Sequence, residues 1–202
     1  MRSRYPEDNE IFNHAMHALS AATARGLAEG YDFSRFSTLA DLGGGDGTLI
    51  SAVLTRHRGL RGVIFDLPHV VIDAPSRLMA AGVADHCEIV AGSFFDVVPV
   101  GCEAYVLKSI LHDWDDDASV RILERVRDST KPGTALLIVE GALVEQHAGP
   151  LAAMSDLNMM LMAGGKERTL TRWRALTDAS GVAITYNVDV GAGWWVIGAR
   201  RV

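Results

Sequence analysis

A glycine-rich segment follows the first apolar stretch of the chain and could contact a ligand. Four glycines and Asp46 fill positions 43–47, directly after the apolar residues 38–42. A turn of this composition lets the backbone approach a bound molecule closely. A second apolar stretch ends in Asp66, 20 residues after Asp46, and an acid at about this separation typically binds ribose hydroxyls. Together these residues predict a site for a nucleoside cofactor, whereas the glycines alone would also suit a plain tight turn.

The residues around the glycines favour S-adenosylmethionine over a nicotinamide dinucleotide. The dinucleotide pattern G-x-G-x-x-G requires a third glycine, but position 48 is Thr48. An acid inside the loop would also repel a pyrophosphate. S-adenosylmethionine carries no phosphate, and its ammonium group is a cation that suits Asp41 and Asp46. A dehydrogenase is therefore the weaker alternative.

His112 is a candidate for proton transfer in a reaction. It follows the fourth apolar stretch, residues 104–107. A histidine has an ordinary pKa close to neutral pH, and removal of a hydroxyl proton typically accelerates a reaction by about 10²–10⁴. A helix-capping or surface histidine is the alternative. The acids at 113 and 115–117 do not have the spacing of a calcium loop and suit the first turn of a helix, so no metal is expected.

The elements that must position these residues alternate between strand and helix. The predicted strands are residues 38–42, 63–65, 87–90, 104–107 and 135–139, and residues 183–188 and 194–199 form a hairpin around a turn at 191–193. The predicted helices are residues 7–29, 49–57, 69–81, 115–129, 151–162 and 170–180. This order predicts an α/β fold with a mostly parallel seven-stranded sheet, an antiparallel hairpin and helices on both faces. Ligands of such sheets bind at the carboxyl ends of the strands.

Composition and charge restrict the class of protein. The chain has 202 residues, 49% of them hydrophobic and 22% charged, which is typical of a globular domain. The net charge of −6 argues against nucleic acid as a partner. No apolar run reaches the roughly 20 residues that span a membrane, and no secretion signal is visible. Only Cys87 and Cys102 are present, so we expect a cytoplasmic protein without a disulfide framework.

Five motifs in order resemble one enzyme family. They are residues 42–47 (LGGGDG), 65–70 (FDLPHV), 92–95 (GSFF), 107–114 (LKSILHDW) and 164–169 (GGKERT). Over residues 5–201 the chain resembles the S-adenosylmethionine-dependent small-molecule O-methyltransferases of the plant caffeate and flavonoid type and their bacterial natural-product relatives. The resemblance implies the Rossmann-like class I methyltransferase fold, S-adenosylmethionine as cofactor with S-adenosylhomocysteine as product, and no metal. It also implies methylation of a phenolic hydroxyl on a small aromatic acceptor.

The resemblance assigns roles to individual residues. It makes His112 the general base, held or polarised by Glu140 and Glu167. Ser93 stands where family members commonly have an aspartate that contacts adenine, so cofactor affinity is expected to be reduced. Lys108 is expected near the carboxylate of the cofactor, Phe94 on its adenine and Trp114 beside it. The cofactor-binding set is Asp41, Gly43, Gly44, Gly45, Asp66, Leu67, Ser93, Phe94, Lys108 and Trp114. The acceptor-binding set is Phe12, Asn13, Met16, Asp113, Asp156, Asn158, Met159 and Met162, whose methionines suit flat ligands but would also suit a core.

The resemblance also concerns domains and partners. Family members carry a helical dimerisation domain ahead of the catalytic domain. We expect a helical segment at residues 1–33 and the S-adenosylmethionine-binding domain at residues 34–202, acting as a homodimer or with a separate N-terminal chain. Two alternatives to methylation stay open. The chain could catalyse a hydroxylation, decarboxylation or cyclisation on the same fold, or it could require a partner chain for activity.

Overall fold

The computed structural model describes residues 20–141, 165–191 and 193–202. The strands are β1 (Thr38–Leu42), β2 (Arg61–Asp66), β3 (Cys87–Ala91), β4 (Ala104–Lys108), β5 (Ala135–Gly141), β6 (Val182–Gly191) and β7 (Trp194–Arg201). The helices are α2 (Thr48–Arg56), α3 (Ala74–Ala80), α4 (Asp116–Ser129) and α6 (Leu170–Ala179), and residues 20–30 are also helical. Short 3₁₀ turns are η1 (Phe33–Arg35), η2 (Val71–Asp73), η3 (Ala84–His86) and η4 (Leu111–Asp113). The predicted helix at 151–162 and most of the one at 7–29 lie outside the described residues.

All seven strands form one sheet in the order β3-β2-β1-β4-β5-β7-β6. Strands β3, β2, β1, β4 and β5 pair in parallel, and β7 pairs antiparallel with both β5 and β6. This arrangement confirms the predicted sheet and its terminal hairpin. The chain order reverses between β1 and β4, so the carboxyl ends of these strands form the switch point at which such folds bind ligands.

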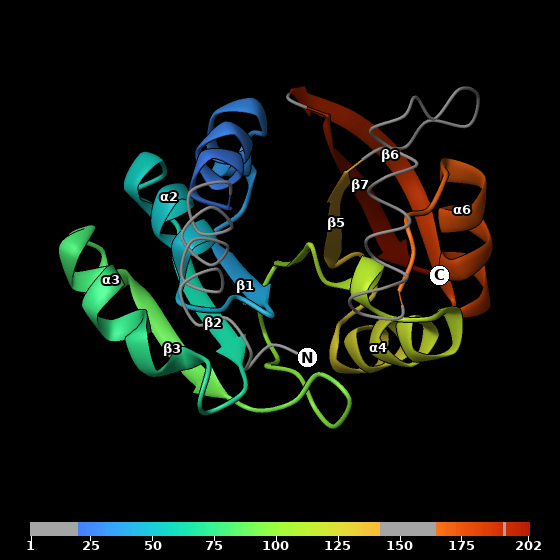
Figure 1. Cartoon of the computed structure of the whole chain (residues 1–202), viewed down its shortest axis with the longest axis horizontal. Coiled ribbons are helices and arrows are strands. Elements are labelled where there is room, and N and C mark those ends of the chain that lie inside the picture. The colour runs from blue at the N-terminus through green and yellow to red at the C-terminus, as the bar shows by residue number, and fades with distance from the viewer. Residues whose placement is uncertain (1–19, 142–164, 192) are drawn as a thin grey trace, which may run out of the picture.

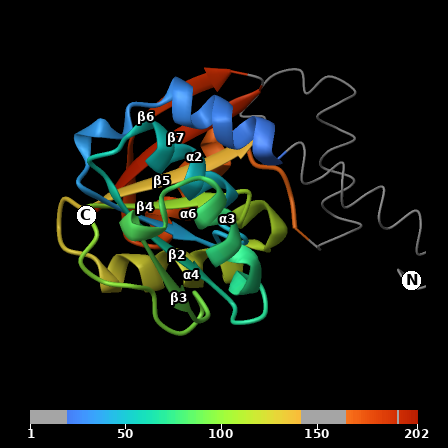
Figure 2. The same cartoon turned by 90° about the vertical axis from the view of Figure 1, so that its left-hand side faces the viewer.

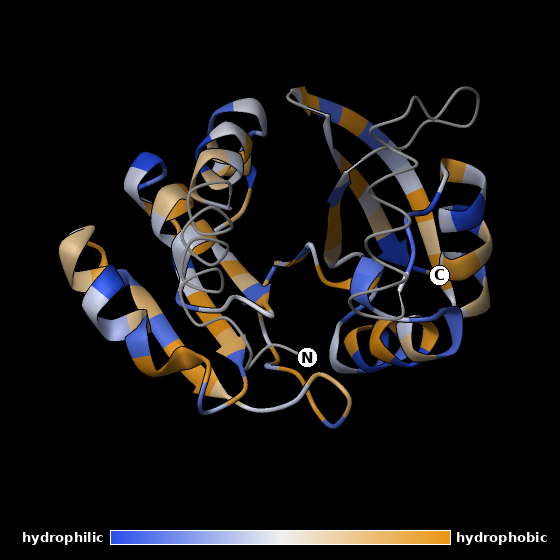
Figure 3. Cartoon of the chain, in the orientation of Figure 1, coloured by the Kyte–Doolittle hydropathy of each residue, from blue (hydrophilic) through white to orange (hydrophobic). Residues whose placement is uncertain are grey.

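Helices cover both faces of the sheet, as Figure 1 shows for α2 and α3 on one side and α4 and α6 on the other. Seen from the side of α2 and α3, these helices lie in front of the strands (Figure 2). Each helix shows both hydrophobic and hydrophilic residues (Figure 3), as expected of elements that bury only one face.

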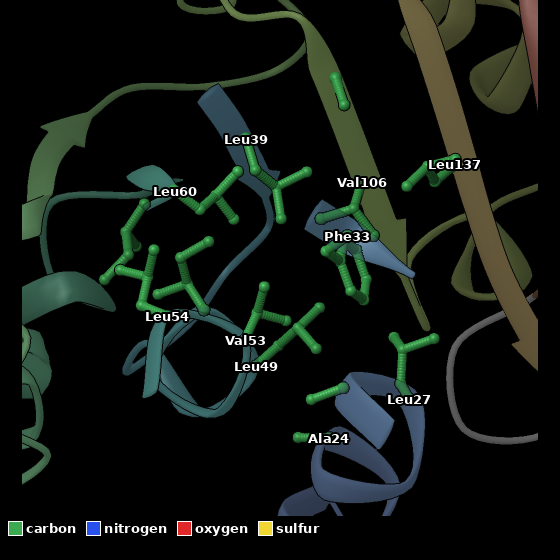
Figure 4. Close-up of a cluster of buried hydrophobic side chains, with 14 of the residues drawn as sticks. Ala24, Leu27, Phe33, Leu39, Leu49, Val53, Leu54, Leu60, Val106 and Leu137 are labelled. Carbon is green, nitrogen blue, oxygen red and sulfur yellow. The ribbon is translucent and has the colours of Figure 1, made fainter. Parts of the chain in front are cut away.

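Two apolar clusters lie on the two faces because side chains alternate along each strand. In β1, Leu39 packs with Leu27, Val53 and Val106 in one cluster, part of which Figure 4 shows. The neighbouring Ala40 belongs to the other cluster, which is formed with α4 and α6. The two clusters fix the sheet between its helices, so the strand ends that carry the polar site residues have a rigid support.

One predicted helix differs from the observed structure. Residues 69–81 form the short turn η2 and then α3, which begins at Ala74 with a proline in its first turn. Proline has no backbone N–H, so it fits the first turn of a helix, where the N–H groups have no intrahelical partner, better than a helix interior. Among the described helices, none is long and apolar enough to cross a membrane.

Candidate active site

The glycine loop lies over the end of β2. The backbone N–H groups of Gly43 and Gly44 both donate to the carbonyl of Phe65, at 2.8 and 3.3 Å. Gly43 has a positive φ of 74°, and a Cβ there would overlap the side chain of Ile110. Phe94 comes within van der Waals reach of the same position. The loop therefore requires glycine, and it brings the ends of β1, β2 and β4 together.

Asp66 connects the glycine loop to the residues after β2. Its Oδ2 accepts a hydrogen bond from the Gly45 N–H at 2.9 Å, and its Oδ1 accepts one from the Leu67 N–H at 2.7 Å. Two backbone donors therefore fix the orientation of this carboxylate. Each carboxylate oxygen can accept a further hydrogen bond, which is what a ribose diol would need.

Asp41 is a buried acid with an unused oxygen. It is 2% exposed, and among the described residues its Oδ2 has no hydrogen-bond partner. Gly44 packs so closely on this carboxyl group that a Cβ would lie 3.0 Å from it. Burial raises the pKa of Asp41 to about 7, and the charges of Asp66 and Asp46 add to this while Lys108 opposes it. An orphaned buried carboxyl oxygen beside a glycine cradle fits a ligand that offers a hydrogen-bond donor or a positive charge.

Asp46 does not have the role that its sequence position suggested. Its carboxylate accepts hydrogen bonds from the hydroxyl of Thr48 at 2.6 Å and from Nε of Arg77 at 2.9 Å. Although burial opposes them, these two partners lower its pKa. Because Arg77 of α3 already balances the charge of Asp46, Asp46 gives little reason to prefer a cationic ligand over a pyrophosphate. The preference for a cationic ligand therefore rests on Asp41.

Lys108 stands at the end of β4 against the hairpin. Its Nζ lies 3.4 Å from the Ser109 hydroxyl and 5.1 Å from the centre of the Trp194 ring. Burial lowers its pKa, and the charges of Asp41 and Glu140 oppose that shift. Sequence reasoning missed Trp194, because only the pairing of β7 with β5 brings the start of the hairpin strand beside the end of β4.

The residues after β3 form an aromatic group. The Trp114 ring contacts those of Phe95 and Phe94 edge-on, with centroids 4.7 and 6.1 Å apart. The Ser93 hydroxyl accepts a hydrogen bond from the Phe95 N–H at 3.2 Å. Serine at this position thus also stabilises the local turn beside the three aromatic rings.

His112 lies between three acids. Its Nδ1 is 3.0 Å from Glu140 Oε2 and 4.0 Å from Glu167 Oε1, and its Nε2 is 3.6 Å from Asp113 Oδ1. The contact with Glu140 is close but is not aligned as a hydrogen bond. Among the described residues, neither His112 Nδ1 nor Glu140 Oε2 has a hydrogen-bond partner. The structure therefore brings together the three residues proposed for catalysis, which come from η4, β5 and the segment before α6.

Glu140 is itself fixed by the backbone that carries His112. It is completely buried, and its Oε1 accepts hydrogen bonds from the Leu111 and His112 N–H groups at 3.1 and 3.3 Å. Burial alone would lower the pKa of His112, but the contact with Glu140 and the charges of Asp113 and Glu167 outweigh it and raise the pKa to about 9. The surrounding carboxylates therefore stabilise the protonated form of the imidazole.

Most of the predicted acceptor-binding residues lie outside the described part of the chain. Of that set only Asp113 lies in the part of the chain that the structure describes; it is exposed and contacts His112. The others, Phe12, Asn13, Met16, Asp156, Asn158, Met159 and Met162, lie outside it. Within the described ranges, no group of three or more histidines, cysteines and acids is arranged to hold a metal ion.

A cavity of about 680 Å³ lies away from these residues. Arg35, Cys102, Lys131 and Arg200 are among its lining residues. It is formed near the amino ends of β1, β4 and β5, at the opposite edge of the sheet from the glycine loop. No predicted site residue lines it.

Known proteins resemble this chain in sequence and in structure. Residues 1–183 match the family of the O-methyltransferase domain. The mitomycin biosynthesis 6-O-methyltransferase of Streptomyces lavendulae is 39% identical over 188 residues, which are 93% of this chain and 54% of that protein. The solved mitomycin 7-O-methyltransferase MmcR has a TM-score of 0.91 and 38% identity, and the match covers 98% of this chain and 59% of that one.

A further solved structure contains bound ligands. The O-methyltransferase NcsB1 from neocarzinostatin biosynthesis, in complex with S-adenosylmethionine and 2-hydroxy-5-methyl naphthoic acid, has a TM-score of 0.81 and 30% identity. The match covers 97% of this chain and 60% of that one. This chain thus spans little more than half the length of these relatives. On the family match and these identities, the chain belongs to the O-methyltransferase domain family and has the class I methyltransferase fold.

Proposed function

We propose that this chain is the catalytic part of an S-adenosylmethionine-dependent O-methyltransferase that methylates a phenolic hydroxyl of a small natural product, with His112 as the general base. The observation that carries the proposal is the placement of His112 against Glu140 and Glu167, beside the strand ends that carry the glycine loop. The relatives named for mitomycin biosynthesis and the naphthoic acid complex support a small aromatic acceptor.

The cofactor half of the site consists of the glycine loop (residues 43–47), Asp41, Asp66, Phe94 and Lys108. It would hold the nucleoside and the amino acid part of S-adenosylmethionine, which supplies the methyl group when bound. Asp66 would accept hydrogen bonds from the ribose, and the unpartnered oxygen of Asp41 would face the positively charged end. Lys108 would face the carboxylate, and Phe94 would stack on the adenine.

The histidine half of the site consists of His112, Glu140 and Glu167. It would hold the acceptor hydroxyl and take its proton. Nδ1 faces Glu140, so a neutral imidazole with its proton on Nδ1 keeps the lone pair of Nε2 for the acceptor. When Nε2 gains the proton, the carboxylates of Glu140 and Glu167 stabilise the resulting cation. Since bound acceptor and methyl group must also be aligned, fixing His112 contributes through orientation as well as basicity.

The proposal also covers the domains, the acceptor contacts, the partners and the cellular location of the protein. The division into a helical segment at 1–33 and a catalytic domain at 34–202 is part of it, as are the acceptor contacts of the first helix and of residues 156–162. So are action as a homodimer or with an N-terminal chain, and a cytoplasmic location. The proposed reaction uses no metal ion, so a chelator should leave the rate unchanged.

Replacement of the base tests the proposal. We expect His112→Gln to lower the rate of methyl transfer from labelled S-adenosylmethionine to a phenolic acceptor by about 10²–10⁴, the typical contribution of a general base. A panel beginning with 2-hydroxy-5-methylnaphthoic acid supplies the acceptors. His86→Gln, at an exposed histidine of η3, is the control and should keep the full rate.

The outcomes are distinct. An unchanged rate in His112→Gln would exclude this histidine as the base. A hydroxylated, decarboxylated or cyclised product that forms without consumption of S-adenosylmethionine would favour the non-methylating alternative on the same fold.

A further inference from the structure

We propose that Arg168 is a positioning residue. It fixes the loop of residues 111–114, which carries His112, so that the imidazole stays between Glu140 and Glu167. The inference rests on the proposed role of His112 as the base. Arg168 itself touches neither the imidazole nor the strand ends of the cofactor half in any described contact.

The guanidinium of Arg168 holds both ends of the loop. It is buried, with 1% exposure, and its two terminal nitrogens donate to the carbonyls of Leu111 and Trp114 at 2.7 and 2.8 Å. These carbonyls flank His112 on both sides. One terminal nitrogen also donates to the Ser119 hydroxyl at 3.2 Å, and Nε donates to Asp116 Oδ1 at 3.0 Å. Four groups of the loop and of the start of α4 therefore depend on one side chain.

The choice of partners distinguishes this arginine from an ordinary ion pair. Burying a cation costs free energy unless it is well paired. The described carboxylate that pairs with Arg168 is that of Asp116, which is 56% exposed and also pairs with Lys166. Most of the other hydrogen bonds that Arg168 donates go to backbone carbonyls. Arginine alone among the side chains presents several donors in one rigid plane, so this arrangement determines the path of a loop more than it neutralises charge.

The backbone next to Arg168 contacts the same loop. The Lys166 N–H donates to the His112 carbonyl at 2.9 Å, and a Cβ at Gly165 would overlap that oxygen. Between Lys166 and Arg168 stands Glu167, whose carboxylate approaches His112 Nδ1. Anchoring Arg168 therefore sets the positions of His112 and Glu167 together.

A positioning role and a merely stabilising role predict different results for the imidazole. The acids that face it are Glu140 from β5, Glu167 from the segment before α6 and Asp113 from its own loop, and together they keep its pKa high. If Arg168 positions the loop, its removal should move the ring away from these carboxylates. If Arg168 only stabilises the fold, its removal should lower the melting temperature and leave the environment of the ring unchanged.

The experiment is an NMR titration of the imidazole signals in the 202-residue chain, with His112→Gln used to assign the signal of His112. We expect Arg168→Met to lower the pKa of His112 by about 1 or more, because the influence of nearby opposite charges on a pKa falls with distance. Arg168→Lys keeps the charge but cannot reach all four partners, so its pKa should lie between those of the wild type and Arg168→Met. Arg172→Met, at an exposed arginine of α6, is the matched control and should titrate as the wild type.

A wild-type pKa for His112 in folded Arg168→Met would overturn the proposal, whatever the loss of melting temperature. If Arg168→Met does not fold, Arg168→Lys decides in the same way. The titration needs neither acceptor nor turnover, so it can succeed even if the proposed methyl transfer fails.

Discussion

The two halves of the site are built differently. In the cofactor half, the glycine loop and Asp66 are held by hydrogen bonds to backbone groups about 20 residues apart in the chain. In the histidine half, buried side chains hold the loop from positions 29 and 57 residues away, as Glu140 and Arg168 do for Leu111. A site formed by neighbouring strand ends leaves a regular pattern in the sequence, whereas one formed by distant side chains does not. The predictions below test whether the two halves can be changed independently.

The largest effect on cofactor affinity is expected at Asp66 in the cofactor half. Asp66→Ala removes the acceptor of two backbone N–H groups as well as the proposed ribose ligand. We expect it to weaken binding of S-adenosylmethionine by tenfold or more in a calorimetric titration, while the pKa of His112 stays near the wild-type value. Unchanged affinity in a folded variant would rule out the ribose role, and a large change at His112 would mean that the halves are coupled.

A second prediction concerns the histidine half. A general base must be neutral, so kcat/KM should rise with pH, reach half of its plateau near pH 9, where half of His112 has lost its proton, and level off above that pH. Glu140→Gln removes the carboxylate that raises the pKa of His112 most, so the plateau should begin at lower pH. A pH profile of methyl transfer, with the affinity for S-adenosylhomocysteine as control, measures this. An identical profile in wild type and variant would contradict the role of Glu140.

Asp41 lies on the border of the two halves, and a smaller effect is expected there. Its pKa of about 7 means that it ionises as pH rises through neutrality. If its carboxylate faces the positive end of the cofactor, affinity should increase several-fold between about pH 5.5 and 7.5, where the cofactor ammonium stays protonated. Calorimetry at a series of pH values should show this for the wild type and a flat profile for Asp41→Asn. A parallel increase in the variant would assign the effect to another group.

The smallest effect is expected at Arg77. Its pairing with Asp46 is partly exposed, with 42% of the arginine side chain accessible, and such pairs contribute little to stability, about 0–1 kcal/mol. Arg77→Met should therefore change the affinity for S-adenosylmethionine by less than about twofold. A tenfold loss would show that the glycine loop depends on α3 and that the cofactor half is less local than its backbone contacts indicate.

The sequence predicted the fold better than the histidine half of the site. Apolar runs bounded by glycine and acid residues located all seven strands, and the hairpin followed from its turn. The break before α3 was missed because a helical pattern on both sides of Pro75 outweighed the local effect of proline. Asp46 was misjudged because its partner, Arg77, reaches it only once α3 packs beside the loop.

The support of His112 was only partly predictable. Glu140 could be expected at the site because it lies at the carboxyl end of β5, at the same edge of the sheet as the carboxyl end of β4. Arg168 was missed because its main partners are the backbone carbonyls of Leu111 and Trp114, and a carbonyl has no signature in a sequence. The same holds for the close approach of Gly165 to His112, which follows only from the packing of two distant segments.

The affinity for S-adenosylhomocysteine of the wild type, Asp66→Ala and His112→Gln tests the central claim most directly, because the product binds without requiring an acceptor. We predict micromolar binding by the wild type, a loss of tenfold or more in Asp66→Ala, and a change of less than about twofold in His112→Gln. No binding by the folded wild-type chain, or equal losses in both variants, would contradict the account of a cofactor half and a histidine half with separate roles.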